Sequence, residues 1–302
     1  MRRHGLAALV LTLALCACAA LAQAAELRRV TDQTGRVLDI PAHPVRVVAL
    51  APSVTEIAFA VGGGPQLVGR TQFSDHPAQA APLPVVGTYV CLDVERIVTL
   101  WPDLCLAVRD GTPRDTVDAL ERFGIPVFAV ENGTLDKVVD SVLAIGDALG
   151  RTKEARTVAD NMRRRIDAVR ETAAHATTRP GVLYQINAEP IIAPGYGTFL
   201  DEIIRLAGGR NLTAATGGYP RFTMEQAIAL APEVIIVPSM DRASTFARAA
   251  AAWREWPHVP AVRDGRIHHV NSDLFDRPSP RLVQGLEHMA RLLHPELFPG
   301  DQ

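Results

Sequence analysis

The stretch Asp93–Val108, DVERIVTLWPDLCLAV, decides the fold because its pattern occurs a second time at Thr223–Pro238, TMEQAIALAPEVIIVP. Glu95 matches Glu225, and a leucine, a proline and an acidic residue follow at the same spacing in both copies. Each copy predicts a short helix that begins at an N-cap residue and stops at the proline. An apolar strand follows in each copy.

Two further blocks repeat in the same order. Thr55–Gly63 resembles Asp201–Gly209, a helix closed by glycines, and Gly124–Val130 resembles Gly265–Asn271, a turn glycine before a strand. Three matches in one order indicate a duplicated α/β unit. Because helices and strands alternate, each copy should form a mainly parallel sheet covered on both faces. We therefore expect an α/β protein of two Rossmann-like lobes with a ligand cleft between them.

One long amphipathic segment lies between the two copies. In Thr152–Ala174 apolar residues recur every three or four positions, which predicts a single helix about 35 Å long. We expect this helix to join the lobes as a rigid strut and to keep lobe motion small; an ordinary surface helix of the first lobe is the alternative. The expected division of the chain is a signal peptide over 1–24, an N-terminal hairpin over 25–45, a first lobe over 46–150, a linking helix over 151–178 and a second lobe over 179–302.

The composition is that of an ordinary globular protein. The 302 residues carry a formal net charge of −2 and no basic run, so neither nucleic-acid binding nor broad attachment to an anionic membrane is expected. No common catalytic or phosphate-binding motif occurs, and the histidines lack metal-ligand spacing. We expect no catalytic residue, no metal site and no cofactor, and hence a monomeric binding protein rather than an enzyme.

The N-terminus has the pattern of a targeting segment. A basic start precedes an apolar run, and Ala22-Gln23-Ala24 matches a signal-peptidase site. Leu15-Cys16-Ala17-Cys18 resembles a bacterial lipobox, which makes lipidation at Cys18 the alternative to cleavage after Ala24. Both outcomes place the mature protein outside the cytoplasmic membrane, in the periplasm. The mature chain then keeps Cys91 and Cys105, which we expect to lie too far apart for a disulfide, with Cys105 a buried free thiol.

The ligand cleft of a two-lobed α/β protein forms where the C-terminal ends of the strands face each other. The loops expected there are aromatic with a few hydrogen-bonding groups, which suits a large, mostly apolar ligand with a polar edge. Tyr89 and Tyr219 each precede their repeat unit by four residues and should lie symmetrically across the opening. Asp273 and Arg277 either contact the ligand or pair with each other. The expected ligand-binding residues are Ser53, Phe73, His76, Tyr89, Tyr196, Tyr219, Asp273, Phe275 and Arg277.

Glu95 and Glu225 are each the second residue of an expected helix. A carboxylate there complements the helix dipole, which is one explanation for either residue alone. It does not explain why both occupy equivalent places on the two lobes. Two exposed carboxylates about a pseudo-two-fold axis are suited to two arginines of a symmetric partner.

Two helix starts also have capping patterns. Ser53-Val54-Thr55-Glu56 matches a capping box that opens the first helix of lobe one. Ser279 precedes Pro280 and is expected to cap the last helix.

Three stretches carry a family resemblance. Arg46–Thr55 (RVVALAPSVT), Leu92–Val108 and Asn271–Arg281 (NSDLFDRPSPR), with the long helix, resemble the class III periplasmic binding proteins over about residues 46–295. That family delivers iron chelates, haem or cobalamin to ABC importers, and the resemblance is greatest to its cobalamin-binding members. It implies that Glu95 and Glu225 dock on arginines of a dimeric permease that works with ATPase subunits. It also implies that Tyr89, Tyr219 and Asp273 lie in a corrinoid site.

The sequence departs from those members at the cleft. Tyr89 and Tyr219 fall where they have tryptophan, Leu274 replaces another tryptophan, and His76 replaces tyrosine. A cleft tyrosine or histidine also suits haem iron as an axial ligand. For anionic siderophores the cleft loops offer few arginines, mainly Arg221 and Arg277. The expected function is the binding component of an ABC importer for cobalamin or a related corrinoid. Haem or ferric-siderophore binding is the alternative, and an adaptor or sensor without transport is the hypothesis of another class.

Overall fold

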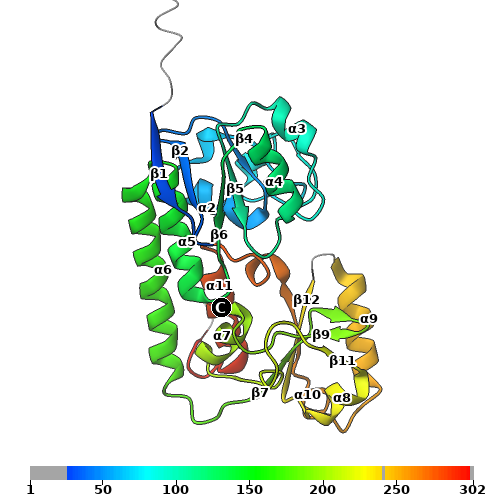
Figure 1. Cartoon of the computed structure of the whole chain (residues 1–302). Helices are drawn as coiled ribbons and strands as arrows, with labels where there is room; N and C mark the ends of the chain where they lie inside the picture. Colours follow the sequence, from blue (N-terminus) through cyan, green and yellow to red (C-terminus); the bar gives the residue numbers. More distant parts are fainter. Residues whose placement is uncertain (1–25, 240–241, 300–302) are drawn as a thin grey trace, which may run out of the picture.

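The computed structural model describes residues 26–239 and 242–299, so the expected signal peptide and the lipobox at Cys18 lie outside the described residues. Figure 1 shows two lobes, one above the other, with a long helix along one side. No helix within the described ranges is both long enough and apolar enough to cross a membrane.

A four-stranded parallel sheet forms the centre of each lobe. The strands of lobe one are β3 (Val47–Ala49), β4 (Leu67–Gly69), β5 (Leu104–Val108) and β6 (Val127–Val130), and those of lobe two are β7 (Gly181–Tyr184), β10 (Arg210–Asn211), β12 (Val234–Ser239) and β13 (Ile267–Asn271). The spatial orders are β4-β3-β5-β6 and β10-β7-β12-β13. In both lobes the first strand along the chain lies between the second and the third, so the predicted duplication is confirmed at the level of topology.

Helices cover both faces of these sheets. Val48 and Cys105 face one hydrophobic core in lobe one, whereas their neighbours Val47 and Leu104 face another, as expected for strands buried on both sides. The helices are α2 (Pro52–Ala60), η1 (Gly64–Gln66), η2 (Ala78–Ala80), α3 (Val94–Thr99), α4 (Arg114–Arg122) and α5 (Leu135–Ala148) in lobe one, and α7 (Phe199–Leu206), α8 (Met224–Ala229), α9 (Arg242–Arg254), α10 (Pro260–Arg263), η3 (Ser272–Leu274) and α11 (Leu282–Leu293) in lobe two.

The repeated stretch keeps its geometry in detail. Residues 91–100 and 221–230 have the same succession of exposed, half-buried and buried positions. Trp101 and Ala231, which occupy equivalent places before a proline, both adopt a left-handed backbone with φ of 49° and 46°. Such a conformation is uncommon for residues other than glycine. Its occurrence at both positions therefore indicates that the turn from helix to strand was inherited by both copies.

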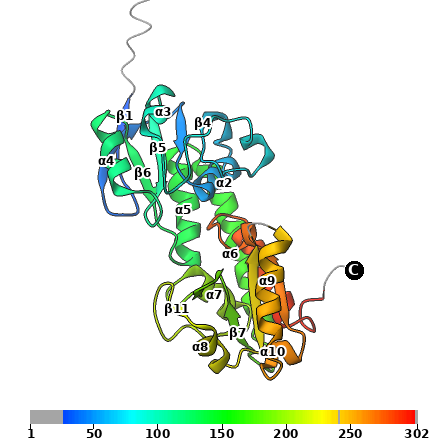
Figure 2. The same cartoon turned by 90° about the vertical axis from the view of Figure 1, so that its right-hand side faces the viewer.

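The two lobes share one hydrophobic core. The helix α6 (Thr152–Ala173) packs against α5 of lobe one and against α7 and α11 of lobe two. Figure 2 shows α5 and α6 both running from the upper lobe toward the lower one. The largest apolar cluster extends from Val54 of lobe one through Met162 of α6 to Leu286 of lobe two. The predicted linking helix is therefore present, and it is embedded in a continuous core rather than standing alone as a strut.

Two smaller sheets complete the fold. The expected hairpin is β1 (Leu27–Thr31) and β2 (Val37–Pro41), paired antiparallel. Lobe two contains in addition a three-stranded antiparallel sheet of β8 (Asn187–Ala188), β9 (Ile191–Ile192) and β11 (Arg221–Phe222), for which lobe one has no equivalent among the described residues. Both cysteines are free thiols and Cys105 is buried, as predicted, whereas the sequence made no prediction for the position of Cys91, which is exposed.

The two capping predictions are wrong. The helix α2 begins two residues earlier than expected, with Pro52 as its first residue and Ala51 as the N-cap, so Ser53 and Glu56 both lie inside the helix. The helix α11 begins at Leu282 with Arg281 as its N-cap residue, and the hydroxyl of Ser279 donates to Glu56 while accepting the backbone N–H of Arg281 at 3.3 Å. The S-x-x-E pattern at residues 53–56 therefore does not mark a helix cap, and Glu56 instead contacts lobe two.

Candidate functional site

A cavity of about 720 Å³ lies between the two lobes. Its lobe-one wall comes from residues that follow the carboxyl ends of β3, β5 and β6, where a ligand cleft was expected. Its lobe-two wall comes from the loops around 197–199, 218–219 and 272–278. The lining residues are Ala51, Pro52, Ser53, Phe73, Tyr89, Val108, Asp110, Asn132, Gly133, Gly197, Thr198, Phe199, Gly218, Tyr219, Ser272, Asp273, Asp276, Arg277 and Pro278.

Six of the nine expected ligand-binding residues line this cavity. They are Ser53, Phe73, Tyr89, Tyr219, Asp273 and Arg277. Tyr89 and Tyr219 come from opposite lobes and leave 41% and 49% of their surface exposed. Large aromatic surfaces left open in a cavity are typical of ligand sites, because burial in a core would otherwise be favourable.

The other three expected residues lie elsewhere. Phe275 is fully buried, and its ring centroid lies 6.0 Å from that of Tyr184. Tyr196 is exposed outside the cavity, where its backbone pairs with Gly217. His76 lines a separate hollow of about 360 Å³, together with Glu56 and Arg281.

Six polar or aromatic lining residues were not among the expected set. They are Asp110, Asn132, Thr198, Phe199, Ser272 and Asp276. Asp110 follows the carboxyl end of β5 by two residues, and Asn132 follows that of β6 by two. Both residues could therefore have been predicted from the rule that the ligand cleft forms at the carboxyl ends of the strands. For Asp276 the signal was weaker, because which side chains of the 272–277 loop face the cavity depends on tertiary packing.

Asp276 and Tyr219 form a polar patch in the wall. Burial raises the pKa of Asp276 from 3.8 to about 6, although its carboxylate accepts a hydrogen bond from the hydroxyl of Tyr184 at 3.2 Å. Burial and the nearby Asp276 charge also raise the pKa of Tyr219 to about 12. At neutral pH the site therefore holds an ionised carboxylate and a neutral phenol in partly desolvated surroundings.

Replacing Asp276 with asparagine is expected to stabilise the ligand-free protein at pH 8. A raised pKa means that the folded state binds this proton more tightly than the unfolded state, whose carboxyl titrates near 3.8. This contribution to stability is present in full below about pH 4 and is lost as the pH rises through about 6. Removing the charge should therefore recover about 3 kcal/mol, or on the order of 6 °C in Tm, at pH 8.

Thermal unfolding at pH 8 and pH 4 measures this effect. Asp276→Asn should raise Tm at pH 8 and leave it unchanged at pH 4. Asp110→Asn removes an exposed carboxylate of the same cavity and should change neither value. An equal gain from Asp276→Asn at both pH values would contradict a cost of ionisation.

The cavity lining has few positive charges that could attract an anionic ligand. Among the described lining residues Asp110, Asp273 and Asp276 are acidic, and Arg277 is the one basic residue. The guanidinium of Arg277 lies 2.8 Å from Asp273, which confirms the pair that the sequence suggested as one of two alternatives. It also lies 2.7 Å from Asp75, so its charge is already neutralised.

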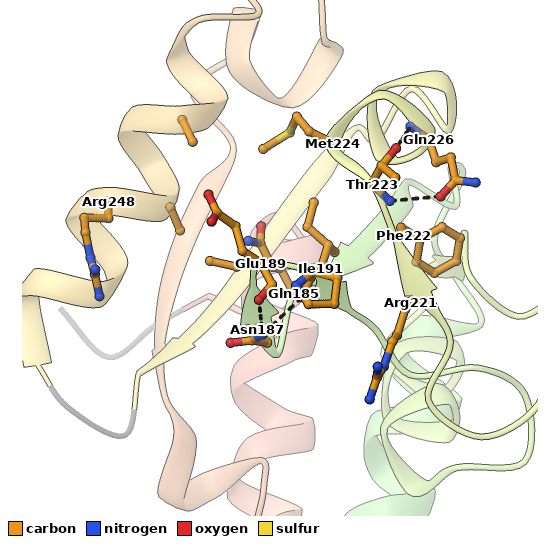
Figure 3. A pocket seen from close by; sticks show the side chains of 14 residues that line it. Gln185, Asn187, Glu189, Ile191, Arg221, Phe222, Thr223, Met224, Gln226 and Arg248 are labelled. Atoms are coloured by element: carbon orange, nitrogen blue, oxygen red, sulfur yellow. Dashed lines mark hydrogen bonds between the residues drawn. The ribbon is translucent and has the colours of Figure 1, made fainter.

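Arg221, the other cleft arginine expected from the sequence, lies in a different hollow. This second pocket, about 610 Å³, is on lobe two between α8, α9 and the small antiparallel sheet. Figure 3 shows Arg221 and Arg248 on its opposite sides, with Gln185 and Ile191 between them. Arg221, which the sequence placed in the ligand cleft, therefore does not line the inter-lobe cavity.

Glu95 and Glu225 occupy equivalent exposed positions in the first turns of α3 and α8. Asp93 caps α3 through the backbone N–H of Arg96, and Thr223 caps α8 in a capping box with Gln226, as predicted. Neither glutamate forms an ion pair within the described part of the chain. Figure 1 shows α3 on one lobe and α8 on the other, both on the side away from α6.

No group of three or more histidine, cysteine or acidic side chains in residues 26–239 and 242–299 is arranged to hold a metal ion. The cavity lining combines the aromatic residues Phe73, Tyr89, Phe199 and Tyr219 with a few polar side chains, a composition suited to noncovalent binding of an organic ligand with an extensive apolar surface.

Comparison with known proteins agrees with this geometry. The family described as periplasmic binding protein matches residues 47–274. The Vitamin B12-binding protein of Vibrio parahaemolyticus is 30% identical over 243 residues, which cover 80% of this chain and 86% of that protein. The periplasmic vitamin B12 binding protein of Vibrio cholerae superposes with a TM-score of 0.74 at 29% identity, covering 85% of this chain and 99% of that one.

A haem-binding relative is equally similar in fold. The periplasmic heme binding protein from Pseudomonas aeruginosa superposes with a TM-score of 0.76 at 27% identity, covering 83% of this chain and 93% of that chain. The backbone alone therefore does not distinguish the two ligands. Since the family match covers most of the chain, this protein belongs to the class III periplasmic binding proteins, a family of substrate-binding rather than catalytic proteins that bind transported ligands and work with ABC transporters.

Proposed function

We propose that this protein is the extracytoplasmic binding component of an ABC importer and that its cleft binds cobalamin or a related corrinoid. The observation that carries the choice of ligand is the charge of the cavity. Three carboxylates line it, and the single guanidinium among the described lining residues is already paired with Asp75 and Asp273. A corrinoid has a rim of neutral amides whose N–H groups donate hydrogen bonds to such carboxylates.

Haem is the second candidate, because solved haem-binding relatives have the same fold. Haem carries two propionates, and these anionic groups are repelled by the carboxylates of the lining, of which Asp276 forms no ion pair within the described part of the chain. An axial tyrosine would need to be deprotonated, whereas the raised pKa of Tyr219 favours the neutral phenol. His76, the other candidate axial ligand, faces a different hollow. These features favour a corrinoid, and the same repulsion disfavours anionic ferric siderophores.

Calorimetry and visible spectra of the purified protein with cyanocobalamin, haemin and a ferric siderophore test this choice. We expect saturable binding of cyanocobalamin at a ratio of one to one without the spectral change of axial ligation by the protein. Haemin should bind at least about a hundredfold more weakly, the equivalent of about 3 kcal/mol. Tighter binding of haemin with a new Soret band would overturn the corrinoid assignment and leave the family membership intact.

The remaining parts of the proposal concern location and partners. We propose that residues 1–24 direct export to the periplasm, with lipidation at Cys18 as the alternative to cleavage after Ala24. The protein would act as a monomer with a permease dimer and its ATPase subunits, docked through Glu95 and Glu225. Mass spectrometry of the mature N-terminus distinguishes cleavage from lipidation. A sensor without transport would keep cyanocobalamin affinity but support no uptake.

A further inference from the structure

A buried cluster of charged side chains joins the two lobes beside the cavity. Glu56, on α2 of lobe one, has a side chain that is only 2% exposed. Its carboxylate accepts hydrogen bonds from Arg281 at 2.6 and 3.0 Å and from the hydroxyl of Ser279 at 2.6 Å. Arg277 is the third donor residue and contributes a fourth hydrogen bond at 3.2 Å. All three donors belong to lobe two, more than 220 residues along the chain.

The cluster continues through Arg277 to the cavity wall. Besides Glu56, its guanidinium contacts Asp75 of lobe one and Asp273 of lobe two. Burial alone would lower the pKa of Arg277, but the hydrogen bond to Asp75 and the charge of Asp273 hold it above its ordinary value. Arg277 therefore remains a cation that connects carboxylates of both lobes.

The positions of these residues tie the two walls of the cavity together. Ser53 lines the cavity from α2, and Glu56 lies one helical turn further on the same face. The loop 272–281 that Glu56 contacts carries five cavity residues, Ser272, Asp273, Asp276, Arg277 and Pro278. A shift of that loop relative to α2 would therefore change the width of the cavity.

A purely structural ion pair is the competing explanation. Buried ion pairs contribute little net stability, because desolvation offsets most of their attraction, whereas removing one partner leaves an uncompensated charge. Arg165 and Glu287 form a half-buried bidentate pair at 2.8 Å between α6 and α11, away from the cavity. This pair provides a comparison for effects on stability alone.

We propose that Glu56 is a positioning residue for the ligand site, which clamps the 272–281 loop of lobe two to α2 of lobe one and thereby fixes the width of the cavity and the direction of Arg277. The ligand then meets a preformed cleft and need not draw the lobes together. The prediction for ligand affinity rests on the proposed function. The prediction for the ligand-free protein does not.

Glu56→Gln keeps the shape of the side chain and removes its charge. Hydrogen exchange of the ligand-free variant should be accelerated about tenfold or more in the 272–281 loop and in α2, because local opening no longer breaks the charged contacts. Its affinity for cyanocobalamin should fall severalfold, because the loop and Arg277 no longer have a fixed position and only the fraction of molecules with the native cavity binds. Ser279→Ala removes a single hydrogen bond to the same carboxylate and should act in the same direction with a smaller effect.

Glu287→Gln is the matched control. It should accelerate exchange only where α6 meets α11 and should leave cyanocobalamin affinity unchanged. Native-like exchange in the 272–281 loop of Glu56→Gln would overturn the clamp, as would equal losses of affinity in Glu56→Gln and Glu287→Gln. If the unmodified protein binds no cyanocobalamin, the proposed ligand is wrong, and the exchange experiment alone then decides the role of Glu56.

Discussion

Replacing both Glu95 and Glu225 with arginine is expected to abolish uptake of the ligand while its affinity for the purified protein stays unchanged. Both carboxylates are exposed in the first turn of a short helix and lie outside the residues that line the cavity. If they meet arginines of the permease, reversal puts like charges in contact at two places, and each lost charge pair costs about 2–5 kcal/mol. Either single reversal should retain measurable uptake.

The measurement compares uptake of labelled cyanocobalamin by intact cells with calorimetry on the purified variants. Arginine in the first turn of a helix also opposes the helix dipole. Each reversal, at Glu95 or at Glu225, is therefore expected to lower the free energy of unfolding slightly, by about 1 kcal/mol at most. Glu154→Arg with Glu171→Arg changes the net charge by the same amount on exposed positions of α6 and should leave uptake intact. Uptake that survives the double reversal at Glu95 and Glu225 would exclude their role in docking.

These two glutamates illustrate what could be predicted from the sequence. Helix starts, apolar strands and proline stops are local patterns. Because they repeat at constant spacing, they predicted a sheet in each lobe and equivalent positions for Glu95 and Glu225. The same logic placed Tyr89 and Tyr219 on opposite walls of the cavity, because each has a fixed offset from its repeat unit. Sequence reasoning succeeded where a local pattern determined the geometry.

Glu56 and Asp276 show why the other residues of the site could not be predicted from the sequence. Glu56 sits in an S-x-x-E pattern that also describes a capping box, and its partners lie more than 220 residues away. No local pattern reports such a contact. In the 272–277 loop the choice of Asp276 over Phe275 for the cavity wall depends on how Phe275 packs against Tyr184. The sequence identified the loop, whereas tertiary packing decided which side chains reach the ligand.

Truncating both Tyr89 and Tyr219 to alanine should weaken cyanocobalamin binding by about a thousandfold. The two rings lie on opposite lobes and keep nearly half of their surface open, so they are available to contact both sides of a flat macrocycle. Loss of one aromatic anchor in a binding site typically costs about 2 kcal/mol, and the two sites are far enough apart for their effects to add approximately. Because neither ring is in a core, Tm should change little.

The conservative variants distinguish the ligand classes. If the rings act by packing, Tyr89→Phe and Tyr219→Phe should keep affinity within about threefold, since the phenol contributes little beyond one hydrogen bond. If either tyrosine ligated iron, its phenylalanine variant would lose haemin binding altogether. Tyr196→Ala is the matched control, because Tyr196 is the most exposed of the three tyrosines and lies outside the cavity. Loss of cyanocobalamin binding in Tyr196→Ala would mean that the ligand occupies another surface, whereas its retention beside the loss in Tyr89→Ala and Tyr219→Ala locates the ligand between the lobes.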